Sequence, residues 1–327
     1  MLMKIITFTA ISFAITGMIA LGLIASDRTK DLTEDSTDGG LNFQSTFERG
    51  ISAAPETTDL KMKDGWSLPV RHYGTQDPSK PLLIFVHGSG WLGLQFNNIA
   101  NALSGDAYVL APDLRGHGAA PERRGDVDYI GQMEDDLTEL IEATRLPDQQ
   151  VILAGHSSGG GLVVRFAGGK HGALMDEAIL LAPFLKHNAP TTRENSGGWA
   201  RVMTRRIIGL SMFNTFKITA LNHLKIIQFN MPKAAREGEY GHLATLAYSF
   251  RLNTGFAPRG DYLKDIEALP KFTLIAGRED EAFFADKYEG VMSAVTNKGA
   301  YHIVDGETHL SIVDAQATED LIREALK

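Results

Sequence analysis

Apolar and polar positions alternate in blocks along the chain and divide it into regions of different character. Positions 5–26 contain no charged residue, while Lys4 precedes this stretch and Asp27 follows it. A signal peptide has an apolar core of ~7–15 residues, whereas a membrane-spanning helix needs ~20. We therefore expect residues 1–26 to form an N-terminal membrane anchor, with a cleaved signal segment as the alternative.

Residues 27–56 are polar and lean acidic, and we expect them to form a tether. From residue 57 onward, short apolar runs bounded by turn residues alternate with segments of helical periodicity. Asp64-Gly65 between two apolar triplets predicts a hairpin, and 129–145 has its apolar side chains at helical spacing. The further runs that we expect to be strands are 82–86, 108–111, 151–154, 178–181, 272–276 and 301–304.

Strands that alternate with helices predict an α/β fold whose mostly parallel sheet is covered by helices on both faces. In such sheets the reactive groups gather at the carboxyl ends of the strands. The strongest candidate follows the run at 151–154 and reads Gly-His-Ser-Ser-Gly at 155–159. Between a strand and a helix, this G-x-S-x-G pattern predicts a sharp turn that exposes the Ser157 hydroxyl as a nucleophile.

A serine nucleophile needs a base, and the base needs an orienting acid. In the strand–turn–helix arrangement, the acid and then the histidine follow the serine along the chain. Asp280 and His309 come shortly after the last two apolar runs, in that order. We therefore predict His309 as the base and Asp280 as its orienting acid, with Glu279 and Glu281 as rival acids.

An oxyanion hole needs N–H groups that point toward the developing charge. We expect one to be the backbone N–H of Ser158, the residue after the nucleophile. We expect the second from Ser89, in the glycine-rich loop His-Gly-Ser-Gly-Trp at 87–91, where Gly88 forms the turn. His87 is interpreted as a residue that organises this loop rather than as a catalytic group.

Together these motifs resemble the α/β-hydrolase superfamily. The stretch Asp-Leu-Arg-Gly-His-Gly at 113–118 is particularly similar to the branch that holds monoacylglycerol lipases, lysophospholipase-like esterases and serine aminopeptidase S33-type hydrolases. The resemblance covers the chain from about residue 57 to the C-terminus. It implies an eight-stranded sheet with a helical cap inserted after strand six. It also implies hydrolysis of carboxylic esters by Ser157, His309 and Asp280.

Two positions depart from the pattern of that branch. Ser158 stands where lipase-like members often have methionine, and Trp91-Leu92-Gly93 stands where they often have a His-Ser pair. These departures do not affect the expected fold, and they leave the substrate open.

The resemblance divides the chain into a hydrolase core at 57–185 and 261–327 and a cap at 186–260. The cap segment is too long for a simple crossover and has helical periodicity. Its bulky apolar side chains are expected to bury the cap against the core and, in part, to line an acyl pocket. They are Ile207, Ile208, Leu210, Met212, Phe213, Phe216, Ile218, Leu221, Leu224, Ile226, Ile227 and Phe229.

Charge and composition narrow the possible partners. The formal charge is −8, which argues against a general nucleic-acid binder. The cap nevertheless carries 11 basic and 3 acidic residues. This suits an anionic lipid surface, although a solvated basic face explains it equally. Without cysteine there is no thiolate metal site, and zinc-protease and phosphate-loop patterns are lacking, so we expect neither a metal nor an organic cofactor.

The sequence thus predicts a serine hydrolase that cleaves lipophilic carboxylic esters, similar to monoacylglycerols or lysophospholipids. We expect it to be membrane-anchored, with the catalytic domain exported to the periplasmic or extracellular side. Secretion after signal cleavage is the alternative.

Three other functions stay open from the sequence. One is an S33-type peptidase or amidase with the same triad, and another is a catalytically silent interaction protein with this fold. The third is a dinucleotide-binding oxidoreductase. It rests on Gly88, Gly90 and Gly93, a literal G-x-G-x-x-G after a strand, with Asp113 at the end of the next strand.

Overall fold

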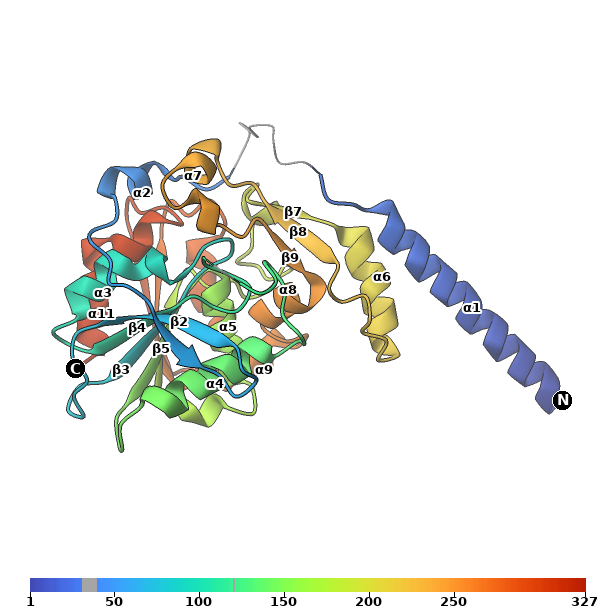
Figure 1. The fold of residues 1–327 in the computed structure, drawn as a ribbon, viewed down its shortest axis with the longest axis horizontal. Helices are drawn as coiled ribbons and strands as arrows, with labels where there is room; N and C mark the ends of the chain where they lie inside the picture. The colour runs from blue at the N-terminus through green and yellow to red at the C-terminus, as the bar shows by residue number, and fades with distance from the viewer. Residues whose placement is uncertain (31–39, 120) are drawn as a thin grey trace.

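An eight-stranded sheet organises the computed structural model, which describes residues 1–30, 40–119 and 121–327 (Figure 1). The strand order is β1-β2-β4-β3-β5-β6-β10-β11, and β2 alone runs antiparallel to its neighbours. The mostly parallel sheet expected from the sequence is therefore confirmed. Its strands are β1 (Thr58–Lys61), β2 (Ser67–Tyr73), β3 (Leu82–Val86), β4 (Tyr108–Pro112), β5 (Val151–His156), β6 (Glu177–Leu181), β10 (Lys271–Gly277) and β11 (Gly299–Val304).

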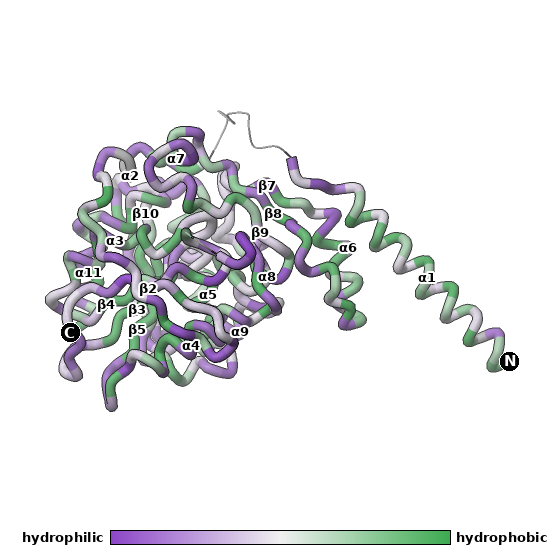
Figure 2. Tube along the Cα trace, in the orientation of Figure 1, coloured by the Kyte–Doolittle hydropathy of each residue, from purple (hydrophilic) through white to green (hydrophobic). Residues whose placement is uncertain are grey.

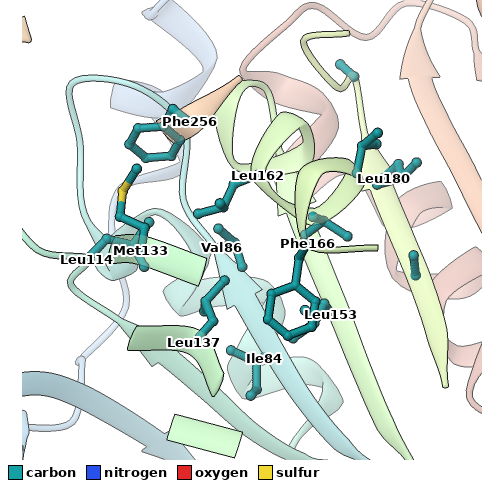
Figure 3. Packing of buried hydrophobic residues seen from close by; sticks show 14 of the residues in the cluster. Ile84, Val86, Leu114, Met133, Leu137, Leu153, Leu162, Phe166, Leu180 and Phe256 are labelled. Atoms are coloured by element: carbon teal, nitrogen blue, oxygen red, sulfur yellow. The ribbon is translucent and has the colours of Figure 1, made fainter. Parts of the chain in front are cut away.

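Helices cover both faces of this sheet, because successive side chains of a strand point to opposite faces and both sets are apolar. In β3, Ile84 and Val86 join the larger core cluster (Figure 3), whereas Leu83 and Phe85 join the second one. The larger cluster lies under α4 (Gln132–Thr144), α5 (Ser158–Ala167), α8 (Phe250–Phe256), α9 (Tyr262–Glu267) and α10 (Tyr288–Met292), and the second under α3 (Asn97–Leu103) and α11 (Gln316–Ala325).

The predicted elements agree with this arrangement to within a few residues at their ends. Every run expected as a strand lies in one, and the two triplets around Asp64-Gly65 form the β1–β2 hairpin. The helix expected at 129–145 begins later, at Gln132. The preceding residue, Gly131, has a φ of 102°, which is left-handed backbone that a helix cannot continue through.

The insertion after β6 contains a small sheet as well as helices. It carries α6 (Thr204–Thr215) and α7 (Lys233–Glu237), but also the antiparallel strands β7 (Ala200–Val202), β8 (Lys225–Phe229) and β9 (Ala247–Ser249). The helical periodicity of the cap segment predicts a helix at Ile226, Ile227 and Phe229, but these residues belong to β8. A short apolar run does not reveal by its spacing whether it is a strand or a helix turn.

The first helix, α1 (Leu2–Ser26), extends away from the body, and its apolar character is plain along its length (Figures 1 and 2). By length and composition it is able to cross a membrane. It packs against the cap helix α6 in antiparallel fashion. The rings of Phe13 and Phe216 lie 5.1 Å apart, and a β-carbon at Gly209 would approach the carbonyl oxygen of Ala20 to 2.6 Å.

The segment between α1 and the core has contacts that the sequence did not predict. Residues 31–39 of the expected tether lie outside the described residues. Beyond them, α2 (Gln44–Arg49) lies against the body beside α7 (Figure 1). Asn97 donates to the Ser52 carbonyl at 2.8 Å, and Asn98 donates to the Gly50 carbonyl at 3.0 Å. This part of the chain is thus bound to the body of the protein.

Candidate active site

Ser157 occupies the turn between β5 and α5, at the carboxyl edge of the sheet. Its φ of 54° and ψ of −121° are unusual for a residue with a side chain and mark a strained turn. A β-carbon at position 159 would lie 2.0 Å from the Val86 carbonyl oxygen, and one at 155 would lie 2.5 Å from the backbone of residue 159. The glycines of G-x-S-x-G therefore permit the close packing that this turn requires.

The structure brings Ser157, His309 and Asp280 together in one hydrogen-bonded chain. The His309 Nε2 atom lies 3.0 Å from the Ser157 Oγ, and its Nδ1 atom lies 2.8 Å from the Asp280 Oδ2. All three side chains are buried. The other oxygen of Asp280 accepts from the backbone N–H groups of Ala282 and Phe283 at 2.8 and 2.7 Å, which fixes the carboxylate.

The two rival acids have other contacts. Glu279 is exposed, and its backbone N–H donates to the Glu307 carbonyl. Glu281 accepts at its Oε2 from the backbone N–H of His309, at 2.9 Å, and so holds the loop of the histidine rather than its ring. The imidazole is therefore oriented by Asp280.

The loop at 88–90 is held by side chains on both sides of Ser89. The Gly88 N–H donates to the Gln95 Oε1 at 2.9 Å, and the Gly90 N–H donates to the Tyr248 hydroxyl at 2.7 Å. Ser89 itself lines the cavity beside Ser157, and its N–H has no acceptor among the described residues. Ser158 is the first residue of α5, so its N–H has no acceptor within that helix.

Gln95 and His156 connect the two halves of the site. Gln95 donates from Nε2 to the His156 Nδ1 at 2.7 Å, and the His156 Nε2 donates to the His309 carbonyl at 2.8 Å. Burial, together with the neighbouring His309, lowers the pKa of His156 well below its usual range, so the ring is neutral, with one donor and one acceptor. The loop that carries Gly88 and the loop of the histidine are therefore joined by one continuous set of hydrogen bonds.

Tyr248 brings the cap into the same network. Its hydroxyl, which accepts from Gly90, donates to the His117 Nε2 at 2.6 Å. The His117 Nδ1 lies within 3.2 Å of two backbone carbonyl oxygens, to which it donates. Sequence reasoning missed both Gln95 and Tyr248. Neither belongs to a motif, and Tyr248 lies far along the chain from the loop that it supports.

His87 organises the loop, in agreement with the interpretation of the sequence. Its Nε2 accepts from the Leu114 N–H at 3.1 Å and its Nδ1 donates to the Gly88 carbonyl at 2.9 Å. Burial lowers the pKa of His87 to about 4, so the ring is neutral at physiological pH. Asp113, the acid of the dinucleotide pattern, accepts from Arg71 at 2.7 Å and from the Gly93 N–H at 2.9 Å. This carboxylate is occupied by internal partners and is not presented to a ribose.

A cavity of about 320 Å³ opens beside Ser157 and His309. This is at the lower end of the ~300–1,000 Å³ found for small-molecule sites. Its walls come from the 88–98 region, the cap, the loop after His309 and the segment at 41–51. The apolar lining residues are Leu41, Phe43, Ile51, Trp91, Leu94, Trp199, Met231, Ala234, Ala235, Leu310 and Val313. The part of the chain that the structure describes contains no group of three or more histidine and acidic side chains able to hold a metal ion.

Residues 77–314 match the family described as serine aminopeptidase, S33. The chain belongs to this α/β-hydrolase family. The protein is thus a member of a family of hydrolases. This membership, with the internal partners of Asp113, argues against the dinucleotide-binding alternative.

Curated relatives of the hydrolase match it over short stretches. The uncharacterized protein Rv2715 of Mycobacterium tuberculosis (strain ATCC 25618 / H37Rv) is 30% identical over 129 residues, which is 39% of this chain and 36% of that protein. The magnesium-chelatase 30 kDa subunit of Rhodobacter capsulatus is 32% identical over 87 residues, or 27% and 30% of the two chains. The hydrolase therefore spans about a third of the length of these relatives.

Solved structures resemble the hydrolase over most of its length. A soluble variant of monoglyceride lipase from Saccharomyces cerevisiae has a TM-score of 0.61 at 16% identity and covers 84% of this chain and 93% of its own. A monoacylglycerol lipase from Paleococcus ferrophilus has a TM-score of 0.59 at 18% identity, with coverages of 79% and 98%. A membrane phospholipase A, described as a bacterial virulence factor, has a TM-score of 0.58 at 16% identity, with coverages of 99% and 96%. At these identities the likeness concerns the fold.

Proposed function

We propose that this hydrolase cleaves lipophilic carboxylic esters, of the monoacylglycerol or lysophospholipid class, through an acyl-enzyme. The observation that carries the proposal is the hydrogen-bonded chain Ser157–His309–Asp280 beside a mostly apolar cavity. An apolar cavity with few polar groups suits the hydrocarbon part of such an ester. The lipases among the structures of similar fold agree with this substrate class.

The reaction follows from the positions of the three side chains. The Ser157 Oγ attacks the ester carbonyl carbon while the His309 Nε2 takes its proton. The tetrahedral intermediate collapses to the acyl-enzyme, and the same nitrogen returns the proton to the departing alcohol oxygen. A water molecule, deprotonated by His309, then attacks the acyl carbon and releases the carboxylic acid and Ser157. Asp280 keeps the Nδ1–H of the imidazole oriented and stabilises the imidazolium.

The negative charge on the carbonyl oxygen is stabilised by the backbone N–H groups of Ser89 and Ser158. Donors that are fixed before the charge develops stabilise it without reorganisation during the reaction. The contacts of Gly88 with Gln95 and of Gly90 with Tyr248 provide this fixation for the Ser89 side.

Replacement of the nucleophile tests the proposal. We expect Ser157→Ala to lower kcat on p-nitrophenyl esters by about 10⁴-fold or more, since removal of one triad member abolishes nucleophilic catalysis. Reaction with a fluorophosphonate should label the wild-type protein and leave Ser157→Ala unlabelled. Equal activity of the two proteins would remove Ser157 from the mechanism.

A peptidase or amidase that uses the same triad is the second candidate, and the description of the matched family favours it. Both reactions need the same nucleophile and base, so the triad does not discriminate between them. A series of aminoacyl amides assayed beside the ester series does. Hydrolysis of the amides with no hydrolysis of any ester would establish the peptidase.

We further propose that α1 is retained as a membrane anchor and that the catalytic domain lies on the periplasmic or extracellular side. The packing of α1 on the cap supports retention, because cleavage after residue 26 would remove the partner of α6. Arg205 and Arg206 donate to the carbonyl oxygens of Ser26 and Ile24, at the end of α1. Cations are favourable at a helix C-terminus.

A further inference from the structure

The segment at residues 41–52, called the strap below, forms one side of the active-site cavity. Among the strap residues whose side chains the structure describes, five line the cavity together with Ser157 and His309: Leu41, Phe43, Thr46, Gly50 and Ile51. The strap precedes the region that matches the family, which begins at residue 77. It is therefore an addition to the site from outside the matched region.

The C-terminal half of the strap is held by two asparagines at the start of α3. Asn98 accepts from the Ser52 N–H at 3.1 Å and donates to the Gly50 carbonyl at 3.0 Å, so it pairs with the strap backbone in both directions. Asn97 donates to the Ser52 carbonyl at 2.8 Å and accepts from the Tyr73 hydroxyl. These bonds go largely to the strap backbone, so they fix its path whatever its side chains are.

Asn42 and Arg49 of the strap are bonded to the loops that carry the proposed acid and base. Glu281 accepts from the Asn42 N–H at its Oε1 and from the His309 N–H at its Oε2, both at 2.9 Å. Arg49 donates to the Ser311 carbonyl at 2.9 Å and lies 3.6 Å from the Glu307 carboxylate. One carboxylate thus ties the strap to the backbone of the histidine.

Apolar contacts turn the strap side chains toward the cap and the loop at 88–94. The ring of Phe43 lies 5.9 Å from that of Trp199, whose Nε1 donates to the Ser89 Oγ at 3.2 Å. Ile51 packs against the cluster of Leu92 and Leu94. Phe43 and Ile51 thus both line the cavity, Phe43 beside the cap and Ile51 beside the loop at 88–94.

We propose that the strap determines substrate specificity: the acyl chain of the ester lies against Phe43 and Ile51, and these two side chains limit its length. This inference rests on the proposed ester hydrolysis. The acyl chain is assigned to this wall because it is the long apolar part of a lipophilic ester, and the strap contributes apolar side chains on a fixed backbone. A fixed wall discriminates between chains that differ by a few methylene groups.

The test is the dependence of kcat/KM on acyl length, measured with p-nitrophenyl esters from acetate to palmitate on the full chain in detergent. Phe43→Ala removes part of the wall and should raise the ratio of long-chain to short-chain kcat/KM by roughly tenfold. Ile51→Trp fills the cavity and should shift the optimum toward shorter chains. Ile303→Ala, which removes an exposed apolar side chain of β11 outside the cavity, serves as the control and should leave the profile unchanged.

Opposite shifts in the two strap variants would support the strap as a specificity element, and unchanged profiles in both would overturn it. Fluorophosphonates with short and long alkyl chains provide a second measurement, because labelling of Ser157 needs no turnover. If the wild type labels at Ser157 but hydrolyses no ester of any length, the proposed function fails. If it hydrolyses esters while both variants keep the wild-type profile, only the strap proposal fails.

Discussion

At the scale of single residues, Ser157, the proposed nucleophile, has closely constrained surroundings. Ser157 adopts a positive φ at the end of a buried strand, and the chain tolerates this because glycines flank it and the peptide is bonded on both sides. Its N–H donates to the Leu181 carbonyl, and its carbonyl accepts from the N–H of Phe184. The strain at this turn is thus held by the neighbouring strand β6 and the chain after it.

A β-carbon at position 159 has no room, so we expect Gly159→Ala to prevent folding or to lower the melting temperature by more than about 10 °C. The new methyl group would lie 2.0 Å from one backbone oxygen and 2.5 Å from another, and backbone atoms in a buried strand cannot move aside. Gly290→Ala is the control, since nothing lies within 4 Å of its β-carbon position in α10. The control should be neutral or stabilised by about 0.5–1 kcal/mol. Equal melting temperatures would contradict the turn geometry.

Asp280 differs from the neighbouring Glu279 and Glu281 because its carboxylate contacts the ring of His309. We expect Asp280→Asn to lower kcat on a short p-nitrophenyl ester by about 10⁴-fold, because an amide favours the wrong tautomer of His309. Glu279→Gln removes an exposed neighbouring carboxylate and should leave kcat within about twofold, as surface charges contribute little. A large loss in Glu279→Gln with activity retained in Asp280→Asn would reverse the assignment.

At the scale of elements, the cap is joined to the active-site loop by a defined contact. The hydroxyl of Tyr248, at the middle of β9, holds the Gly90 N–H from one side and His117 from the other. Both partners are buried. The cap therefore contributes to the geometry of the site as well as covering it.

Tyr248→Phe should lower kcat by roughly ten- to a hundredfold with little change in KM, because the loop of Ser89 loses a support while the cavity keeps its ring. The unpaired Gly90 N–H should also cost roughly 1–3 kcal/mol of stability. Tyr301→Phe is the matched control, because the Tyr301 hydroxyl is buried and has no hydrogen-bond partner among the described residues. Its removal should change neither kcat nor the free energy of unfolding. A loss of stability alone in Tyr248→Phe would make the tyrosine structural only.

The elements predicted from the sequence are those whose signal is local. The strand Leu82–Val86 is uniformly apolar between turn residues, and G-x-S-x-G between a strand and a helix specifies both a backbone shape and a side chain. The order Ser157, Asp280, His309 follows from the arrangement itself. By contrast, the three-stranded sheet of the cap depends on pairing between segments about 20 residues apart or more, which no local pattern records.

The contacts that the sequence did not reveal are those between distant segments with ordinary composition. Gln95, Tyr248 and the strap have no motif, since their roles depend on which backbone groups lie opposite them after folding. The sequence offers Glu281 only as a rival acid, whereas in the structure its carboxylate accepts from two backbone N–H groups. A carboxylate in that role has the same sequence signature as one that orients a histidine.

At the scale of the whole molecule, several of the cap's basic side chains bind to groups within the protein rather than standing free in solvent. Arg251 pairs with Asp126, and Arg259 pairs with Glu134 and Asp265. The arginines near α6 bond to the end of α1, as described above. These four arginines thus hold the cap to the body and to α1, and the proposed association with a membrane depends chiefly on the apolar helix.

We expect the full chain to stay in the membrane pellet after an alkaline carbonate wash and to begin at Met1. Replacing Ile11 and Ile15 together by lysine should release it, since each lysine near the middle of a membrane helix costs about 2.5–3.5 kcal/mol. Both side chains are exposed on α1. Ile303→Lys, at an exposed apolar position of the body, should leave the protein in the pellet. A soluble protein that begins near residue 27 would establish secretion after cleavage.

The packing of α1 against α6 also determines how deeply the protein must enter a membrane that α1 spans. The 25 residues of α1 measure about 37 Å, and the part from Phe13 to its end, which runs beside α6, measures about 20 Å. Only about 17 Å of α1 extends beyond α6, which is less than the ~30 Å hydrocarbon thickness of a bilayer. For α1 to cross the membrane, the tip of α6 must therefore be immersed with it, and the exposed Phe216 and Ile218 at that tip are suited to hydrocarbon. An enzyme immersed in this way would meet its ester in the lipid leaflet rather than in water. Its rate would then depend on the amount of ester per unit area of membrane, not on the concentration of ester in solution.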